Sequence, residues 1–177
     1  DEQTGQLTKK CTMEPGQTVN RMHADRERRL IYAVDGAQNL KGLPAGGGHV
    51  FVYKIVNREG HLEKIQEKRT IAANPFFFET SPDRKTAAAA CHGGKSAVTR
   101  LVKKEDGSYG EEIVYDDGCV ELFELREDGT IGELVFADIH KGSGPSDRQY
   151  SAHPHCCRYT HDGRFVVCCD TGNDTVQ

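Results

Sequence analysis

The stretch KTAAAAC, residues 85–91, carries four consecutive alanines, which favour a helix by intrinsic propensity. The run is too short for an ordinary helix, however, and two other stretches also begin with a basic residue and continue with apolar ones: RLIYAVD (29–35) and RFVVCCD (164–170). A turn-like segment precedes each of the three, and Gly-rich or polar residues follow each, as around short strands. KTAAAAC is therefore predicted to be one copy of a strand that recurs three times.

Further elements repeat around these strands. A tight turn containing Gly, followed by an extended segment, is predicted at TGQL (4–7), EGHL (59–62) and DGTI (128–131). Apolar and polar residues alternate in HVFVYKIV (49–56) and CVELFEL (119–125), which is typical of half-buried strands. Gly, Pro and Asn interrupt every candidate for an amphipathic helix. The sequence therefore predicts an all-β fold.

The spacing of the repeats indicates a β-propeller. Arg29 and Lys85 are 56 positions apart, whereas Lys85 and Arg164 are 79 apart, so the second unit has an excess of about 23 residues. That excess matches residues 95–117, which we predict to be a hairpin inserted in a loop. A repeat of about 50 residues with four strands is typical of a propeller blade. We expect residues 1–177 to form one domain of about three blades.

Three blades are too few to close a ring, because propellers usually have at least four. The sequence begins on what is expected to be the outer strands of one blade, and it ends at GNDTVQ, where another outer strand is expected to begin. We therefore expect the chain to be an incomplete piece of a longer propeller, or one that needs partner copies.

Composition narrows the classes of partner. The formal net charge is -4, with 27 acidic residues against 23 Lys and Arg, so the surplus of basic residues usual in nucleic-acid or anionic-membrane binding is missing. No stretch approaches the 18 apolar residues of a membrane-spanning helix. The seven cysteines are odd in number and include two adjacent pairs, which favours free thiols in a reducing cytoplasm. We expect a cytoplasmic protein with a small-molecule ligand and no nucleic-acid or membrane partner; the oligomeric state stays open.

The polar stretch GSGPSDRQYSAHPHCC, residues 142–157, is the strongest candidate for a functional site. Because residues two apart in a strand share a face, His153, His155 and Cys157 are predicted to point one way. Two other interpretations remain open. The strand could be a polar packing element with Arg148 in a structural ion pair to an acid such as Asp147, or it could hold zinc.

The zinc alternative rests on four side chains that are competent metal ligands. They are His153, His155, Cys157 and His161. The sequence has no C-x-x-C pair, and alternate residues of one strand seldom supply a closed tetrahedral set. We therefore expect no metal here, and we interpret the Cys pairs 156/157 and 168/169 as small apolar residues of the core.

Residues 142–176 resemble the signature of the seven-bladed propeller lactonases, a family that includes bacterial 6-phosphogluconolactonase and fungal carboxy-cis,cis-muconate cyclase. The corresponding features are the GSGP loop, the pair Arg148 and Gln149, His153-x-His155, the turn 161–164 and the loop 172–174. Similarity is traceable over most of the chain, including CHGG (91–94) and residues 118–134. Two features depart from the family pattern: Ala152 stands where the family has Pro, and the insertion at 95–117 is not general.

The resemblance implies a seven-bladed ring whose axial pocket receives the two histidines, and an activity without a cofactor. The implied reaction is hydrolysis of a sugar lactone, with 6-phosphogluconolactone as the first substrate to test. The alternatives are a muconate-type cyclase on the same fold and a propeller that only binds.

The implied roles follow the chemistry of lactone opening. His155 is expected to be the general base or acid, His153 its neighbour, and Arg148 the partner of an anion or oxyanion. Gln149 is expected to orient substrate or to hold the loop, and His92 to reach the pocket from the neighbouring blade. The missing blades are expected to carry further Arg and Glu residues of the site.

Overall fold

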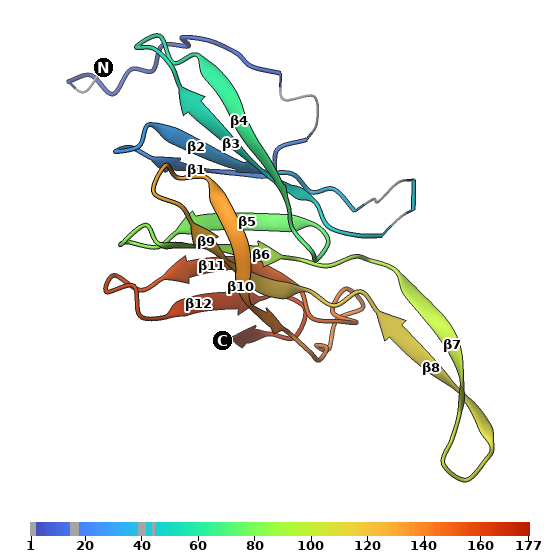
Figure 1. The fold of residues 1–177 in the computed structure, drawn as a ribbon. Coiled ribbons are helices and arrows are strands. Elements are labelled where there is room, and N and C mark those ends of the chain that lie inside the picture. The colour runs from blue at the N-terminus through green and yellow to red at the C-terminus, as the bar shows by residue number, and fades with distance from the viewer. Residues whose placement is uncertain (1–2, 15–17, 39–41, 44) are drawn as a thin grey trace.

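The structure is a computed structural model that describes residues 3–14, 18–38, 42–43 and 45–177. Within these residues the chain forms thirteen strands and no helix, as Figure 1 shows, so the described part has no helix that could cross a membrane. The all-β prediction is confirmed.

Eleven of the strands form three antiparallel sheets, which correspond to three blades and confirm the predicted piece of a propeller. Blade 1 contains β1 (Arg21–Asp25), β2 (Leu30–Val34), β3 (His49–Ile55) and β4 (Leu62–Arg69); blade 2 contains β5 (Pro75–Thr80), β6 (Thr86–Cys91), β9 (Cys119–Leu125) and β10 (Ile131–Ile139); blade 3 contains β11 (Pro154–Tyr159), β12 (Val166–Asp170) and β13 (Thr175–Val176). The three repeated stretches supply the second strand of each blade, namely β2, β6 and β12.

The strand β6 explains why an alanine run suits this fold. Ala87 and Ala89 lie in the core between blades 1 and 2, whereas Ala88 and Ala90 lie in the core between blades 2 and 3. All four are fully buried. Because β6 is covered on both faces, its side chains are uniformly apolar, and their small size lets both neighbouring blades pack closely against it.

The first strand of each blade lies on the inner side of the assembly, since β5 packs against both β1 and β11. The beginning of β5 pairs with the end of β6, and the beginning of β11 pairs with the end of β12. These four strand ends therefore lie at one edge of blades 2 and 3, and the candidate site is built there.

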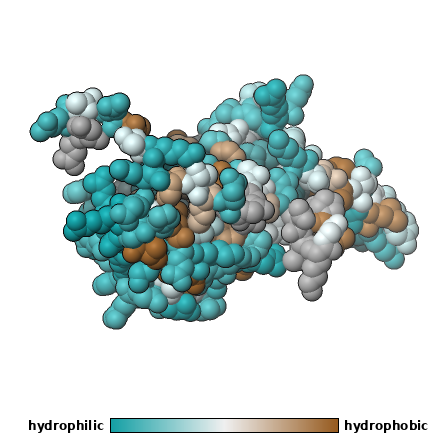
Figure 2. All heavy atoms as spheres, turned by 90° about the horizontal axis from the view of Figure 1, so that it is seen from above, coloured by the Kyte–Doolittle hydropathy of each residue, from teal (hydrophilic) through white to brown (hydrophobic). Residues whose placement is uncertain are grey.

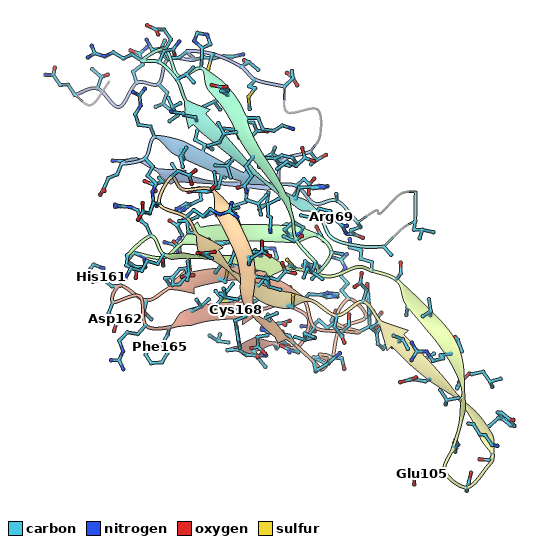
Figure 3. All side chains as sticks on the ribbon, in the orientation of Figure 1. Arg69, Glu105, His161, Asp162, Phe165 and Cys168 are labelled. Carbon is cyan, nitrogen blue, oxygen red and sulfur yellow. The ribbon has the colours of Figure 1, made fainter. Side chains whose placement is uncertain are left out.

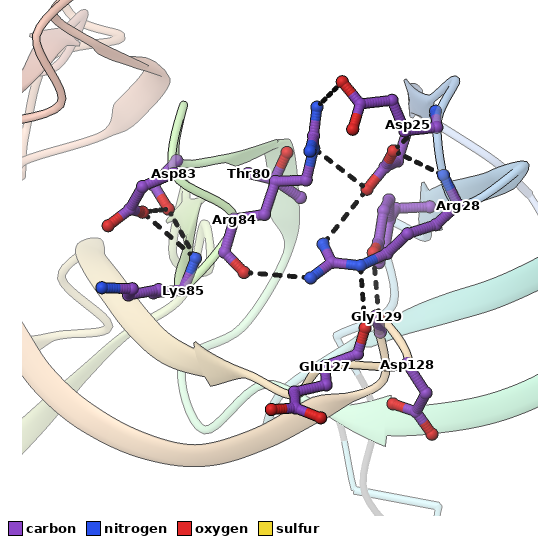
Figure 4. A network of polar contacts seen from close by, with 12 residues as sticks. Asp25, Arg28, Thr80, Asp83, Arg84, Lys85, Glu127, Asp128 and Gly129 are labelled. Atoms are coloured by element: carbon purple, nitrogen blue, oxygen red, sulfur yellow. Dashed lines mark hydrogen bonds and ion pairs between the residues drawn. The ribbon is translucent and has the colours of Figure 1, made fainter.

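At the other end of β5, a polar network joins blades 1 and 2 (Figure 4). Asp25, a buried residue, accepts a hydrogen bond from the Arg28 guanidinium at 3.2 Å and lies 3.8 Å from that of Arg84. Arg84 also pairs with Glu27, and Arg28 donates to the carbonyl of Glu127 at 3.0 Å. The network fixes the turns of the two blades to each other at the end remote from the candidate site.

A hairpin interrupts blade 2. Its strands β7 (Ala97–Lys103) and β8 (Tyr109–Tyr115) pair only with each other, while β6 and β9 on either side of it pair directly. Figure 3 labels Glu105 at its tip, far from the three sheets. Exposed apolar side chains such as Val98 and Leu101 lie along it. Figure 2 shows brown, hydrophobic surface on the arm that projects at the right.

One expectation about the amino-terminal region is wrong. The described residues before Arg21, which are 3–14 and 18–20, form no strand, so neither the extended segment after TGQL nor the outer strands of a further blade are found there. Met13 and Val19 instead pack against the outer face of blade 1, beside Ala33, Phe51 and Tyr53. Burial of these apolar side chains takes the place of strand pairing.

Candidate active site

An open cleft of about 770 Å³ lies at the edge of blades 2 and 3, within the size range of small-molecule sites. It is formed by the loop after β6, the loop between β10 and β11, and the turn after β12. Its lining residues are His92, Lys95, Ser146, Asp147, Arg148, Gln149, Tyr150, His153 and Thr171. The structure thus brings together four of the five residues predicted from the sequence.

Among the described residues of this lining, His153 is the one that is buried. Its side chain is buried, and its Nδ1 lies 2.9 Å from the carbonyl oxygen of His92. A carbonyl oxygen can only accept, so Nδ1 carries the proton and the lone pair of the neutral ring is on Nε2. The hydroxyl of Ser151 lies 3.5 Å from Nε2. His153 therefore presents a proton acceptor with a fixed tautomer.

His92 stacks on His153 with ring centroids 4.3 Å apart and an angle of 8° between the planes. Burial, and after it the charges of the neighbouring His153, His155 and Lys95, lower the pKa of His92 to about 4. Its Nδ1 is buried and makes no hydrogen bond within the described residues. His92 is therefore neutral at pH 7 and leaves one polar atom without a partner beside the cleft.

The lowered pKa of His92 predicts a loss of stability in acid. Between pH 6.5 and about pH 4 the unfolded chain binds the proton that the folded chain excludes, so stability is full above pH 6.5 and falls as the pH drops through this window. From pH 7 to pH 5 we expect a loss of about 1 kcal/mol from this residue, reduced for its partial exposure. Urea denaturation of wild type and His92→Gln at both pH values measures it.

The control for this prediction is His161→Gln, because His161 is exposed on the turn between β11 and β12. Wild type and this control are expected to lose the same stability between pH 7 and pH 5, and His92→Gln less. An equal loss in all three proteins would show that His92 is protonated as easily in the folded chain as in the unfolded one.

His155 lies beside the cleft rather than in its lining. Its side chain is exposed, and its ring packs on Phe76 at 4.5 Å and lies 6.3 Å from that of His92. The pairing of β11 with β12 shifts by one residue between Pro154 and Cys156, so His155 falls at this irregularity. His153 and His155 both face blade 2, as the two-residue spacing predicts, but only His153 is enclosed.

The pair Arg148 and Gln149 separates into two roles. The Gln149 side chain accepts from the backbone N–H of Ser146 at 3.1 Å and donates to Thr171 at 3.1 Å and Asp174 at 2.6 Å. Its polar atoms are thereby used to hold the loop, one of the two roles expected of it. Among the described residues no carboxylate pairs with Arg148, so the ion-pair interpretation is wrong and the guanidinium is available to a ligand.

Asp170, at the end of β12, is the buried residue that fixes this edge. One carboxylate oxygen accepts from the backbone N–H groups of His153 at 2.7 Å and Gly172 at 2.8 Å, and the other lies 2.7 Å from Nδ1 of His140. Burial acts to raise the pKa of Asp170, but these hydrogen bonds outweigh it and lower the pKa. An ionised carboxylate therefore positions the backbone of His153.

The four donors of the zinc alternative are not brought together. Figure 3 places His161 at the turn between β11 and β12, whereas His153 lies immediately before β11, at the opposite end of that strand. In the part of the chain that the structure describes, metal-ligating side chains converge only at Cys91, Cys119 and Glu121 in the core. Glu121 uses its carboxylate to accept the backbone N–H groups of residues 71 and 72, which is a structural role.

Sequence reasoning did not assign five of the lining residues to the site, which are Lys95, Ser146, Asp147, Tyr150 and Thr171. The signal for Ser146 and Tyr150 was their place beside the Arg-Gln pair, and for Lys95 its place directly after CHGG. Tyr150 packs edge to face on His153, with ring centroids 5.4 Å apart at 85°. It therefore encloses the imidazole together with His92, which stacks on the same ring.

Comparison with known proteins agrees with this architecture. Residues 1–177 match the family described as "Lactonase, 7-bladed beta-propeller". The chain is 37% identical over 152 residues to the 6-phosphogluconolactonase of Bacillus subtilis, which is 86% of this chain and 35% of that protein.

Two solved structures share the fold. The periplasmic gluconolactonase PpgL of Pseudomonas aeruginosa has a TM-score of 0.65 at 21% identity, over 88% of this chain and 37% of that one. A protein from Lactobacillus plantarum has a TM-score of 0.62 at 17% identity, over 89% and 36%. The chain spans a little over a third of the length of each of these three proteins. It belongs to the family of seven-bladed β-propeller lactonases.

Proposed function

We propose that the protein of which this chain is part hydrolyses a sugar lactone, with 6-phosphogluconolactone as its substrate. The observation that carries the proposal is the hydrogen bond from Nδ1 of His153 to the carbonyl of His92, which leaves the lone pair of the neutral ring on Nε2. The cleft that His153 lines also holds the unpaired cation of Arg148. The 37% identity to the 6-phosphogluconolactonase of Bacillus subtilis supports the choice of substrate.

The proposed reaction begins with a water molecule between His153 and the lactone carbonyl. Nε2 takes a proton from the water as its oxygen bonds to the carbonyl carbon, and the Arg148 guanidinium stabilises the oxyanion that forms. When the oxyanion collapses, the bond between the carbonyl carbon and the ring oxygen breaks. The imidazolium then returns its proton to the ring oxygen, which leaves as a hydroxyl, and the other product group is a carboxylic acid that ionises in water.

His155, which the sequence favoured as the base, takes a secondary place in this proposal. It is exposed beside the cleft, and no described residue fixes its tautomer by a hydrogen bond. His92 is neutral and stacked on His153, so it supports the ring without adding a charge that would oppose formation of the imidazolium. We therefore propose His153 as the base and His155 as its neighbour.

The test is a lactonase assay on the complete protein. Ring opening of 6-phosphogluconolactone is expected to be saturable and to exceed the spontaneous rate, with kcat/KM of at least about 10⁴ M⁻¹s⁻¹. Acid release at constant pH, or oxidation of the product by a coupled dehydrogenase, measures it. Carboxymuconate is the control substrate: lactonisation of carboxymuconate without hydrolysis would favour a cyclase, and turnover of neither substrate a binding scaffold.

A further inference from the structure

The inserted hairpin borders the cleft as well as projecting from blade 2. Lys95 lines the cleft immediately before β7, and Tyr115 ends β8. The ring of Tyr115 packs on that of Tyr150 at 5.8 Å, and Tyr150 in turn packs on His153. The base of the hairpin is thus in contact with the side chain that encloses the proposed base.

The base of the hairpin is also closely packed. Gly94 donates its N–H to the carbonyl of Asp116 at 3.2 Å, which joins the two ends of the insertion. A Cβ at Gly93 would lie 2.3 Å from the carbonyl oxygen of Asp116, and one at Gly94 would lie 2.4 Å from its carboxylate. This close packing fixes the backbone of the residues next to Lys95. It therefore also fixes the position of the Lys95 Cα, from which the side chain extends to the cleft.

The lining of the cleft carries more positive than negative charge. Lys95 and Arg148 are its two cations, and Asp147 is its one carboxylate. Across the described ranges 3–14, 18–38, 42–43 and 45–177, neither cation has an ion-pair partner, although Asp116 lies beside Gly94. Lys95 is near enough to His92 to lower its pKa. Two unpaired cations beside the neutral imidazole of His92 favour a ligand that carries a phosphate at one end and an uncharged reacting group at the other.

We infer that Lys95, held by the inserted hairpin, determines specificity for phosphorylated over unphosphorylated lactones by binding the phosphate, while Arg148 stays available to the oxyanion of the reacting lactone group. This inference rests on the proposed function and names the residue that selects its substrate. Lys95 binds the non-reacting end of the substrate, so its contribution appears mainly in KM and in product affinity.

The test compares wild type, Lys95→Gln, Lys95→Arg and Lys103→Gln in the complete protein. Lys103 is the matched control, since it is an exposed lysine of β7 that does not line the cleft. Calorimetric binding of 6-phosphogluconate and of gluconate, both stable products, is measured beside turnover of the two lactones. In Lys95→Gln the Kd for 6-phosphogluconate is expected to rise about tenfold or more, whereas that for gluconate changes less than about twofold.

Lys95→Arg is expected to restore most of the affinity, and Lys103→Gln to match wild type. The ratio of kcat/KM for the phosphorylated lactone over glucono-lactone should fall in Lys95→Gln in parallel with product affinity. An unchanged preference in Lys95→Gln, or an equal loss with both products, would overturn the inference. Failure to open either lactone would instead contradict the proposed function, and the binding measurement would still decide the role of Lys95.

Discussion

Replacement of His153 by glutamine is expected to lower kcat/KM for lactone hydrolysis by about 100- to 1,000-fold, the usual contribution of a general base. A glutamine amide can still donate to the carbonyl of His92, which now accepts from Nδ1 at 2.9 Å, but it has no basic nitrogen for the proton of water. Steady-state kinetics of the complete protein measure the effect, and it should appear in kcat because the proton moves in the transition state.

Two further variants make this result specific. His155→Gln is expected to lose less than about tenfold, because His155 stands outside the cleft lining, and His161→Gln is expected to match wild type. If His155→Gln lost more activity than His153→Gln, the base would be His155. Retention of half or more of the wild-type kcat/KM by His153→Gln would exclude His153 from the proton transfer.

Replacement of Asp170 by alanine is expected to lower the free energy of unfolding by about 3–5 kcal/mol, the range for breaking a buried, hydrogen-bonded charge. The change removes the acceptor for the N–H groups of His153, Gly172 and Asn173 and for the ring of His140, all near the buried end of β12. Urea denaturation at pH 7 measures it. Asp170→Asn, which keeps one acceptor oxygen, should lose less.

The matched control is Asp162→Ala, at the exposed turn between β11 and β12. Its carboxylate also accepts from a backbone N–H, that of Arg164 at 3.2 Å, and from the hydroxyl of Thr160 at 2.6 Å. Both contacts are exposed, so both donors can bind water when the carboxylate is removed. The free energy of unfolding of this variant is therefore expected to be close to that of wild type. Equal stability of the two alanine variants would show that Asp170 does not hold the edge of blade 3.

Much of the fold could be predicted because each blade repeats the same local pattern. The basic residue, apolar run and polar turn around Lys85 recur at Arg29 and Arg164, so the alanine run was assigned as a strand against its helical propensity. The segment before Arg21 could not be predicted in this way. TGQL carries the turn signal, but strand formation also needs a neighbouring edge to pair with, and that is decided by tertiary structure.

The candidate site could be predicted only in part, for a similar reason. The spacing of His153 and His155 predicts a shared side, and the resemblance implies the approach of His92. The nitrogen of His153 that stays free is decided by the carbonyl of His92, which lies 61 residues away in the sequence. Lys95 reaches the cleft because the two ends of the inserted hairpin are joined beside it. Local pattern says nothing about such contacts.

The small alanines of β6 also set the distance between two blades and thereby the geometry of the candidate site. Ala88 and Ala90 are the side chains of β6 that face blade 3, so their size determines how closely the two blades pack. The same strand ends at Cys91 and is followed directly by His92. A bulkier side chain at either position would increase the distance between the two blades. It would thereby separate the stacked rings of His92 and His153 without contacting either ring. The distance between these two imidazoles thus depends on side-chain volume in the core as well as on the residues that line the cleft.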